Sequence, residues 1–326
     1  MAEGETVAEK LRRIIQAGYL LPDEIDWAAR FEQLKAHGYL LRPRYRPGWV
    51  RPWKTGGSLF VEEEAITPVS TNLDATRVSD GAMVFLKLVS KSSPEIEIGR
   101  LLASEELRLD PRNHTIPLLD VIEDSTDPER VILVLPSLRA IDSPSPTTIR
   151  ECLELVNQTL EALVFLHEHQ IAHRDCATDN IMLDGRALFP GSWHPQRVYA
   201  TPDGQHAIPE PSLREAKSVS YYLIDFGIST LNQSMTTGNL GQERAPELSD
   251  DTPYDPYKLD VYILGMAYRR FFSLQFEEIG FIVPLVEIMT HEDPTQRPTA
   301  LAAYEKFKAR EKARRSDPGT ISNMHY

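Results

Sequence analysis

The pattern of apolar and polar positions divides the chain into a strand-rich part followed by a helix-rich part. Residues 83–89 form a dense apolar run with one lysine, and residues 131–135 form another that ends at Pro136. Both runs are typical of buried strands. From 149 to 167 the apolar residues recur at helical spacing instead, which predicts a long, mostly buried helix. This order indicates an α+β fold with a small sheet-rich lobe and a larger helical lobe.

One main helix is expected within the sheet-rich part. Ser93 followed by Pro94 places an N-cap residue before a proline, which is well tolerated at the first helical position. This start signal predicts a helix over residues 95–102. Asp80-Gly81, shortly before the first apolar run, is a hairpin signal.

Residues 1–57 form an extension before the strand-rich part. Residues 5–18 and 23–37 carry apolar stripes at helical spacing and predict two amphipathic helices. Residues 42–53 are rich in arginine, proline and aromatic side chains and cannot form a regular helix. Such a segment could bind nucleic acid, but docking within the molecule is the favoured interpretation in a chain with a formal net charge of −13.

Two further segments are expected to be irregular. Residues 184–218 contain five prolines and predict a polar loop inserted into the helical part. Residues 311–326 form a charged tail that is expected to fray.

Composition limits the environment and the partners that are expected. The acidic net charge disfavours nucleic acid as a partner. Two cysteines in 326 residues do not make a disulfide framework and favour a reducing compartment. The chain has no apolar run of 18 residues and no signal-peptide pattern at its start, so we expect no membrane segment and a cytoplasmic or nuclear location.

The first chemical motif follows the long helix directly, at His173-Arg174-Asp175. Asn180 stands five residues after the aspartate. A carboxylate and an amide on one short loop can point into the same cleft.

A second motif and a buried lysine could complete such a site. The apolar residues 221–224 predict a short strand that delivers Asp225-Phe226-Gly227 at its end, where the glycine allows a sharp turn. Lys87 is the lysine within the apolar run 83–89. A lysine in such a strand is normally paired or expelled to the surface.

These motifs occur in the order found in protein kinases, followed by Arg244-Ala245-Pro246-Glu247, Asp260 and Arg297. The chain therefore resembles the eukaryotic protein-kinase superfamily over about residues 60–310. The segment 39–49 is similar to one found in a divergent kinase-like group expanded in fungi. In kinases the aspartate corresponding to Asp260 anchors the catalytic loop, and the two residues corresponding to Glu247 and Arg297 form an ion pair.

The resemblance implies a bilobal kinase domain over residues 58–310. It places the N-lobe at 58–135, the hinge at 136–138 and the C-lobe at 139–310. The implied cofactors are ATP and Mg²⁺, and the implied partner is a protein substrate of unknown identity. The oligomeric state stays open.

The same resemblance assigns roles to individual residues. The implied set is Asp175 as the base, Arg174 as the residue that positions the activation segment, Lys87 as the contact of the α- and β-phosphates, Asn180 and Asp225 as the Mg²⁺ ligands, and Leu135, Pro136 and Leu138 as the gatekeeper and adenine-binding hinge. A glutamate of the following helix should pair with the lysine, and Glu97 is preferred over Glu105 because it begins the apolar pattern of that helix.

The sequence departs from the kinase pattern in three places. Residues 66–72, where a glycine-rich phosphate loop is expected, contain no glycine. Ala177 replaces the lysine that Ser/Thr kinases carry two residues after the base, and Leu240 replaces that lysine's threonine partner. Asp179 replaces the arginine that tyrosine kinases carry in this loop. These positions support neither acceptor class, and a serine or threonine acceptor is retained over tyrosine.

Three functions remain open at this point. The first is a protein kinase that transfers the γ-phosphoryl group of ATP to a protein hydroxyl, which retention of the lysine, the base and both metal ligands favours. The second is a pseudokinase that serves as a nucleotide-binding or regulatory module, which the glycine-free loop and Ala177 favour. The third is a small-molecule kinase, which is disfavoured because such enzymes lack the Glu247–Arg297 partners.

Overall fold

The computed structural model describes residues 20–49, 71–216, 218–275, 280 and 282–316. The helix expected at residues 5–18 and residues 66–70 of the expected phosphate loop lie outside this range. The chain divides into two compact units, each described by itself below: the first comprises residues 1–91, 119–137 and 189–210, and the second comprises the remainder.

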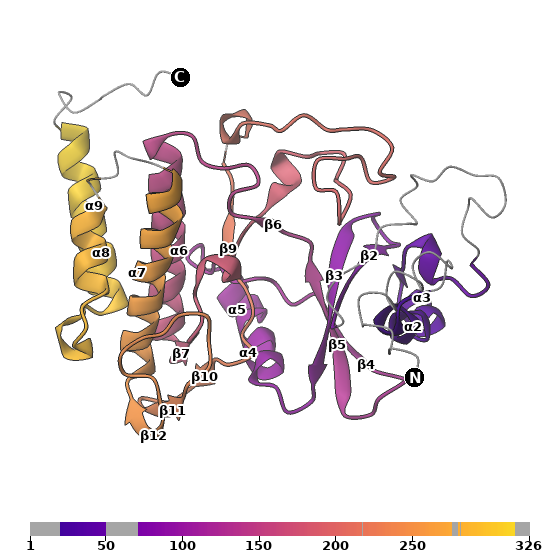
Figure 1. The fold of residues 1–326 in the computed structure, drawn as a ribbon, viewed down its shortest axis with the longest axis horizontal. Coiled ribbons are helices and arrows are strands. Elements are labelled where there is room, and N and C mark those ends of the chain that lie inside the picture. The colour runs from indigo at the N-terminus through magenta and orange to yellow at the C-terminus, as the bar shows by residue number, and fades with distance from the viewer. Residues whose placement is uncertain (1–19, 50–70, 217, 276–279, 281, 317–326) are drawn as a thin grey trace, which may run out of the picture. The chain divides into compact units, whose positions relative to one another are not determined.

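The first unit is built on an antiparallel five-stranded sheet with the strand order β1-β2-β3-β5-β4 (Figure 1). The strands are β1 (Tyr39–Leu40), β2 (Asn72–Arg77), β3 (Met83–Ser90), β4 (Asp120–Glu123) and β5 (Arg130–Pro136). β3 and β5 are the two apolar runs predicted as buried strands, so this prediction is confirmed. The β2–β3 turn contains Gly81, whose φ of +71° is in the left-handed region that glycine adopts readily.

The N-terminal extension supplies the edge strand β1 and covers one face of this sheet. It forms α2 (Pro22–Ala28), α3 (Phe31–Ala36) and a short 3₁₀ turn, η1 (Pro43–Tyr45). The prediction of a single helix over residues 23–37 is therefore wrong, because the structure has two helices there. The break falls at Arg30, whose guanidinium donates to both carboxylate oxygens of Asp124 near the end of β4 at 2.9 and 2.7 Å.

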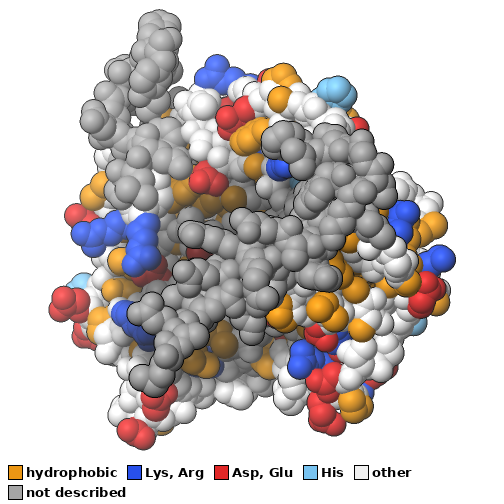
Figure 2. All heavy atoms as spheres, turned by 45° about the vertical axis from the view of Figure 1, so that its right-hand side comes forward, with side chains coloured by type: hydrophobic (Ala, Val, Ile, Leu, Met, Phe, Trp, Pro, Cys, Tyr) orange, Lys and Arg blue, Asp and Glu red, His pale blue; other side chains and the backbone are white. Residues whose placement is uncertain are grey.

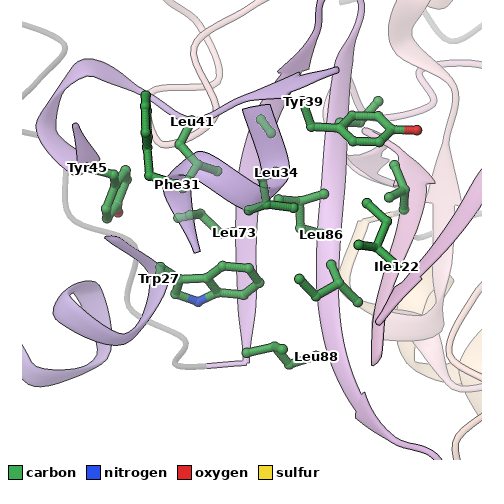
Figure 3. Close-up of a cluster of buried hydrophobic side chains, with 14 residues drawn as sticks. Trp27, Phe31, Leu34, Tyr39, Leu41, Tyr45, Leu73, Leu86, Leu88 and Ile122 are labelled. Carbon is green, nitrogen blue, oxygen red and sulfur yellow. The ribbon is translucent and has the colours of Figure 1, made fainter. Parts of the chain in front are cut away.

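A shared apolar core joins the extension to the sheet. Figure 3 shows side chains of the extension and of the sheet pointing into one cluster, which includes Trp27, Phe31, Leu34, Tyr39, Leu41, Tyr45, Leu73, Leu86, Leu88 and Ile122. Two buried ion pairs, Arg44 with Glu24 and Arg42 with Asp74, lie beside it, each at 2.8 Å. Residues 42–49 of the basic and aromatic segment therefore dock within the molecule, as predicted, and contribute to the core of this unit.

The second unit is mainly helical. Its helices are α4 (Pro94–Leu102), α5 (Glu105–Arg108), α6 (Ile149–Glu168), α7 (Pro256–Gln275), α8 (Val283–Met289) and α9 (Ala300–Ser316). Its short strands are β6 (Arg139–Ala140), β7 (Ile171–Ala172), β8 (Ile181–Leu183), β9 (Tyr221–Leu223), β10 (Thr230–Leu231), β11 (Thr236–Gly238) and β12 (Ser249–Tyr254).

Both predicted helix starts in this unit are confirmed. α4 begins where Ser93 accepts a hydrogen bond from the backbone N–H of Glu95 and Pro94 takes the first helical position. α6 begins with a capping box between Thr148 and Glu151 and matches the predicted long helix.

The division into units differs from the predicted lobe boundaries in two places. Helix α4 was expected with the sheet and groups with the helical unit. Residues 189–210 of the proline-rich insertion group with the sheet unit, where Phe189 and Trp193 are buried with their rings 5.7 Å apart. Burial of these two aromatic side chains anchors the segment, although its composition predicted a polar loop.

The charged side chains of the described residues are interspersed over the face drawn in Figure 2, with acidic and basic groups mixed rather than gathered. Among the described residues, no helix has the length and apolar character needed to cross a membrane.

Candidate active site

A buried carboxylate fixes the loop that follows β7. Asp260 on α7 accepts hydrogen bonds from the backbone N–H groups of His173 and Arg174 at 2.8 and 2.6 Å and from Nε2 of His167 at 2.9 Å. Arg174 has a φ of +65°, a costly conformation for a residue with a Cβ, which the surrounding contacts must maintain. The predicted anchoring role of Asp260 is confirmed.

His173 occupies the interior of this loop in one tautomer. Its Nδ1 accepts a hydrogen bond from the backbone N–H of Asp175 at 3.2 Å, so the proton lies on Nε2, which donates to the carbonyl of Ile224 at 2.9 Å. The ring centroid is 4.9 Å from that of Phe226. Burial lowers the pKa of His173, and nearby carboxylates, led by Asp260, only partly oppose this effect.

The carboxylate of Asp175 is held by neutral amide donors. Nδ2 of Asn180 donates to Oδ2 of Asp175 at 3.0 Å and to its backbone carbonyl at 2.8 Å. The backbone N–H of Gln242 donates to Oδ1 at 2.8 Å, and Nε2 of Gln242 lies 3.2 Å from Oδ2. Because Nδ2 of Asn180 donates to Asp175 within the loop, its side-chain oxygen Oδ1 is the atom that could bind a cation.

Strand pairing brings the two predicted metal ligands together. β8 and β9 are antiparallel neighbours, and Asn180 directly precedes β8, while Asp225 lies two residues beyond β9. The backbone N–H of Ile224 donates to the carbonyl of Asn180 at 3.0 Å, which fixes this register. Asp225 has a φ of +64°, a strained conformation typical of functional sites.

The lack of a side chain at Gly227 lets its backbone lie close to the carboxylate of Asp225. A Cβ at this position would lie 3.1 Å from Oδ1 of Asp225, so a side chain there would crowd the carboxylate. The turn predicted at this glycine exists, with its backbone N–H donating to Oδ1 of Asp225 at 3.2 Å.

These ligands suit Mg²⁺, which is commonly bound by one or two carboxylates together with substrate phosphates. Among the described residues, no group of three or more His, Cys, Asp or Glu side chains could hold a metal ion. Asn180 and Asp225 therefore fit a site that a phosphate ligand completes.

The buried glutamate of α4 is Glu95. Its side chain lies inside with those of Ile98 and Leu102, and its Oε2 is 3.8 Å from the position of a Cβ at Gly227. Glu97 and Glu105, the two residues considered from the sequence, are both exposed. The signal that could have found Glu95 is the helix start at Ser93, because it sets which residues share a helical face.

Lys87 lies on β3 between Asn72 of β2 and Leu133 of β5. Phe85 lies two residues before it and therefore on the same face of the sheet. Phe85 takes the place of the alanine in the V-A-I-K strand of kinases, and it is directly opposite Leu135 of β5.

The residues predicted as the hinge lie at the end of β5 and directly after it. Leu135 is buried, and Pro136 is the last residue of the strand. Leu138 belongs to the second unit. The backbone N–H of Ser137 donates to the carbonyl of Met83 at 3.4 Å, which holds the end of β5 against β3.

Arg174 contacts the segment that follows Asp225. Its Nη1 donates to the carbonyl of Ile228, and its Nη2 donates to the carbonyl of Thr237 and the hydroxyl of Tyr254, at 2.8–3.0 Å. The Tyr254 hydroxyl in turn donates to the carbonyl of Gly238 at 2.9 Å. The contacts are those expected of a residue that positions this segment.

The predicted pair of Glu247 and Arg297 is confirmed. Arg297 donates to both carboxylate oxygens, the longer bond being 2.9 Å, and its side chain is fully buried. Its guanidinium also lies 4.5 Å from the ring centroid of Tyr262 on α7. A bidentate pair in this setting ties the end of the activation segment to the helical unit.

A family model described as "Protein kinase domain" matches residues 70–276. The match covers more than half of the chain, so the chain belongs to the protein kinase family and has its α+β, bilobal fold. Members of this family are ATP-dependent phosphotransferases of the protein-kinase type. A comparison with curated proteins found no match. The match begins at Ser70, so residues 20–49, which complete the sheet, lie outside it.

Proposed function

We propose that this chain transfers the γ-phosphoryl group of ATP to a protein hydroxyl, on serine or threonine in preference to tyrosine, with Mg²⁺ as the metal cofactor. The observation that carries the proposal is the convergence of Asp175, Asn180 and Asp225, which one loop and the end of one strand bring together. Kinase chemistry depends mainly on positioning and electrostatic stabilisation, which this set can supply.

In this proposal each group acts as its chemistry allows. Asp175 accepts the proton of the substrate hydroxyl, and Asn180 and Asp225 would hold Mg²⁺, whose charge would stabilise the phosphates. Lys87 contacts the α- and β-phosphates, and the residues that bind adenine are Leu135, Pro136 and Leu138.

We further propose Glu95 as the partner of Lys87, in place of Glu97 or Glu105. A glutamate that orients a lysine should itself be buried and fixed, and of these three only Glu95 is buried. A cation near its carboxylate would offset the cost of its burial.

A pseudokinase is the second candidate, and two observations favour it. Phe85 places an aromatic ring where the family has a methyl group, beside Leu135 at the predicted adenine site. Ala177 is buried and supplies no cation to the loop. A small-molecule kinase is disfavoured because the Glu247–Arg297 pair is intact.

The deciding experiment measures nucleotide binding and phosphoryl transfer on the same preparation. Calorimetry with ATP and Mg²⁺ should show binding, and radiolabelled ATP should label the protein itself or a generic protein substrate. Asp175→Asn should abolish labelling without abolishing binding. Nucleotide binding with no transfer by the unaltered protein would favour the pseudokinase, and absence of both would reject the nucleotide site.

Phe85→Ala separates the two candidates further. If the ring restricts adenine, the alanine variant should bind ATP more tightly than the unaltered protein. Equal affinity would show that the phenyl group lies clear of the nucleotide.

The cysteines fit an intracellular, reducing environment, and we propose a cytoplasmic or nuclear location. Cys152 and Cys176 are both free and buried. Burial raises the pKa of Cys152 to about 12, so its thiol stays protonated and unreactive.

A further inference from the structure

The base candidate Asp175 is oriented by a residue from outside its own loop. From the described residues, three hydrogen bonds reach its carboxylate, and two of them come from the backbone and side chain of Gln242. A carboxylate offers about four acceptor positions, so these contacts leave room for one more donor, such as a substrate hydroxyl.

The backbone around Gln242 is shaped for this contact. Gly241 has a φ of +112°, in the left-handed region that favours glycine. A Cβ at Gly241 would lie 3.3 Å from the carbonyl of Arg174 and 3.3 Å from Oδ1 of Asp175. The glycine therefore lets the chain pass close to the base and direct the next N–H at it.

Contacts on both sides hold the segment in place. Before Gln242, the hydroxyl of Tyr254 donates to the carbonyl of Gly238. After it, the buried carboxylate of Glu243 forms an ion pair with Arg270 on α7 at 2.8 Å. The position of Gln242 is thus fixed by contacts that do not involve Asp175.

Gln242 also supplies a side-chain hydrogen-bond donor to Asp175, which the residues at positions 177 and 240 cannot provide. Ala177, in the catalytic loop, is buried and has no donor side chain. Leu240 is 63% exposed and offers no polar group to the base. In the described part of the chain, the side-chain donors to the Asp175 carboxylate are the amides of Asn180 and Gln242.

We propose that Gln242 is the positioning residue of Asp175, replacing the lysine and threonine missing at positions 177 and 240. The proposal rests on the proposed kinase function. Because an amide is neutral, Gln242 orients the carboxylate without adding positive charge beside the transferred phosphoryl group. That charge must then come from the other groups that bind the phosphates.

The test is a set of substitutions at one exposed position. Gln242→Leu keeps the backbone N–H and removes the side-chain donor, so kcat for phosphoryl transfer should fall about tenfold while KM for ATP stays unchanged. Gln242→Lys restores a donor to Oδ2 and should return kcat at least to the unaltered level. Gln242→Ala, which also removes the side-chain donor but introduces a smaller side chain, should lower kcat as much as Gln242→Leu does if the fold is preserved.

Gln233→Leu is the matched control, because Gln233 is exposed in the same segment and should leave both constants unchanged. A Gln242→Leu variant as active as the unaltered protein, while Asp175→Asn is inactive, would overturn the proposal. A variant more active than the unaltered protein would also overturn it, by showing that Gln242 obstructs the base.

A second readout separates this inference from the proposed function. If the unaltered protein transfers no phosphoryl group, the proposed function fails, but the contact can still be measured by hydrogen exchange of the Gln242 backbone amide. Exchange should be slow in the unaltered protein and faster in Asp175→Ala. Equal exchange in both would show that Asp175 does not hold Gln242.

Discussion

Nη2 of Arg174 donates a hydrogen bond of 2.8 Å to the hydroxyl of Tyr254, and both side chains are buried. This contact connects the catalytic loop to β12, the strand that pairs with the activation segment at β11. The other acceptors of the guanidinium are backbone carbonyls of Ile228 and Thr237. In the described part of the chain, neutral acceptors therefore already engage both Nη atoms, which could otherwise bind a phosphorylated side chain, while the buried Nε has no hydrogen-bond partner there.

Removing the Tyr254 hydroxyl should loosen the activation segment. Tyr254→Phe leaves Arg174 without one acceptor and Gly238 without a donor, so the free energy of unfolding should fall by about 1–3 kcal/mol. Urea denaturation measures the loss, and limited proteolysis should show faster cleavage around residues 236–238. Tyr222→Phe is the control, because the Tyr222 hydroxyl has no hydrogen bond among the described residues and its loss should change little. A Tyr254→Phe variant as stable as this control would show that the contact contributes nothing.

Activation by phosphorylation at the buried positions of this segment is not expected. Ser229 and Thr230 are buried, and the hydroxyl of Ser229 donates to the carbonyl of His173 at 2.9 Å. Ser234 and Thr237 are exposed. If the protein labels itself with ATP, peptide mass spectrometry should find phosphate at the exposed pair. Modification at Ser229 in the folded protein would contradict the observed burial.

The two glutamates of α4 provide a matched comparison. Glu95→Gln removes a buried charge that we propose to orient Lys87, and should lower the rate of phosphoryl transfer at least about tenfold, equivalent to ~1.4 kcal/mol of barrier. Glu97→Gln changes an exposed group two residues away and should leave the rate unchanged. Steady-state rates at saturating ATP distinguish them. A larger loss from Glu97→Gln than from Glu95→Gln would return the pairing role to Glu97.

The extension should be essential for the stability of the sheet unit. Trp27 is 2% exposed and lies in the core cluster of Figure 3. Trp27→Ala should lower the free energy of unfolding by about 3–5 kcal/mol, because it leaves a cavity under the sheet. Ile25→Ala, on the same helix but at a position 58% exposed, should cost about 0.5 kcal/mol or less. Denaturation curves of the two variants that coincide would mean that α2 packs too loosely to support the sheet.

Local sequence patterns predicted those strands and helices whose formation depends on residues close together in the chain. The apolar runs at β3 and β5 and the helical spacing of α6 each reflect burial along one element, and the structure places those elements as expected. The loop after β7 and the turn at Asp225 are also present where the motifs predicted them, because those motifs are short and continuous. The pairing of Glu247 with Arg297 followed from the order of motifs in the kinase family.

The features that were missed depend on contacts between distant segments. Nothing in residues 39–40 alone shows that they pair with β2, more than 30 residues further along the chain. The choice of Glu95 over Glu97 on α4 and Glu105 on α5 depended on which helical face meets Gly227. The approach of Gln242 to Asp175 depends on the path of a loop, which apolar periodicity does not describe.

The buried His173 should make the protein sensitive to mild acid. Burial lowers its pKa, so the folded protein keeps the ring neutral while the unfolded chain takes up a proton near the ordinary value of about 6.5. The stabilising contribution is therefore complete above about pH 6.5 and is lost as the pH falls below it, by at most about 1.4 kcal/mol per pH unit for this group. Protonation would also place an N–H on Nδ1 against the backbone N–H of Asp175.

Unfolding free energies measured at pH 8, 7, 6 and 5.5 test this expectation. His114, whose pKa burial also lowers, acts in the same direction, so His114→Gln serves as the background. Asp74 and Glu243, whose pKa values burial raises, act in the opposite direction, because the folded protein holds their protons more tightly than the unfolded chain does. In that background, adding His173→Gln should remove the part of the stability loss between pH 7 and pH 5.5 that His173 causes, so the unfolding free energy should fall less over this range, even if the variant is less stable throughout. If the unfolding free energy depends on pH as strongly after the second substitution as before it, the acid sensitivity belongs to another group. His173 would then bind its proton equally in the folded and unfolded states.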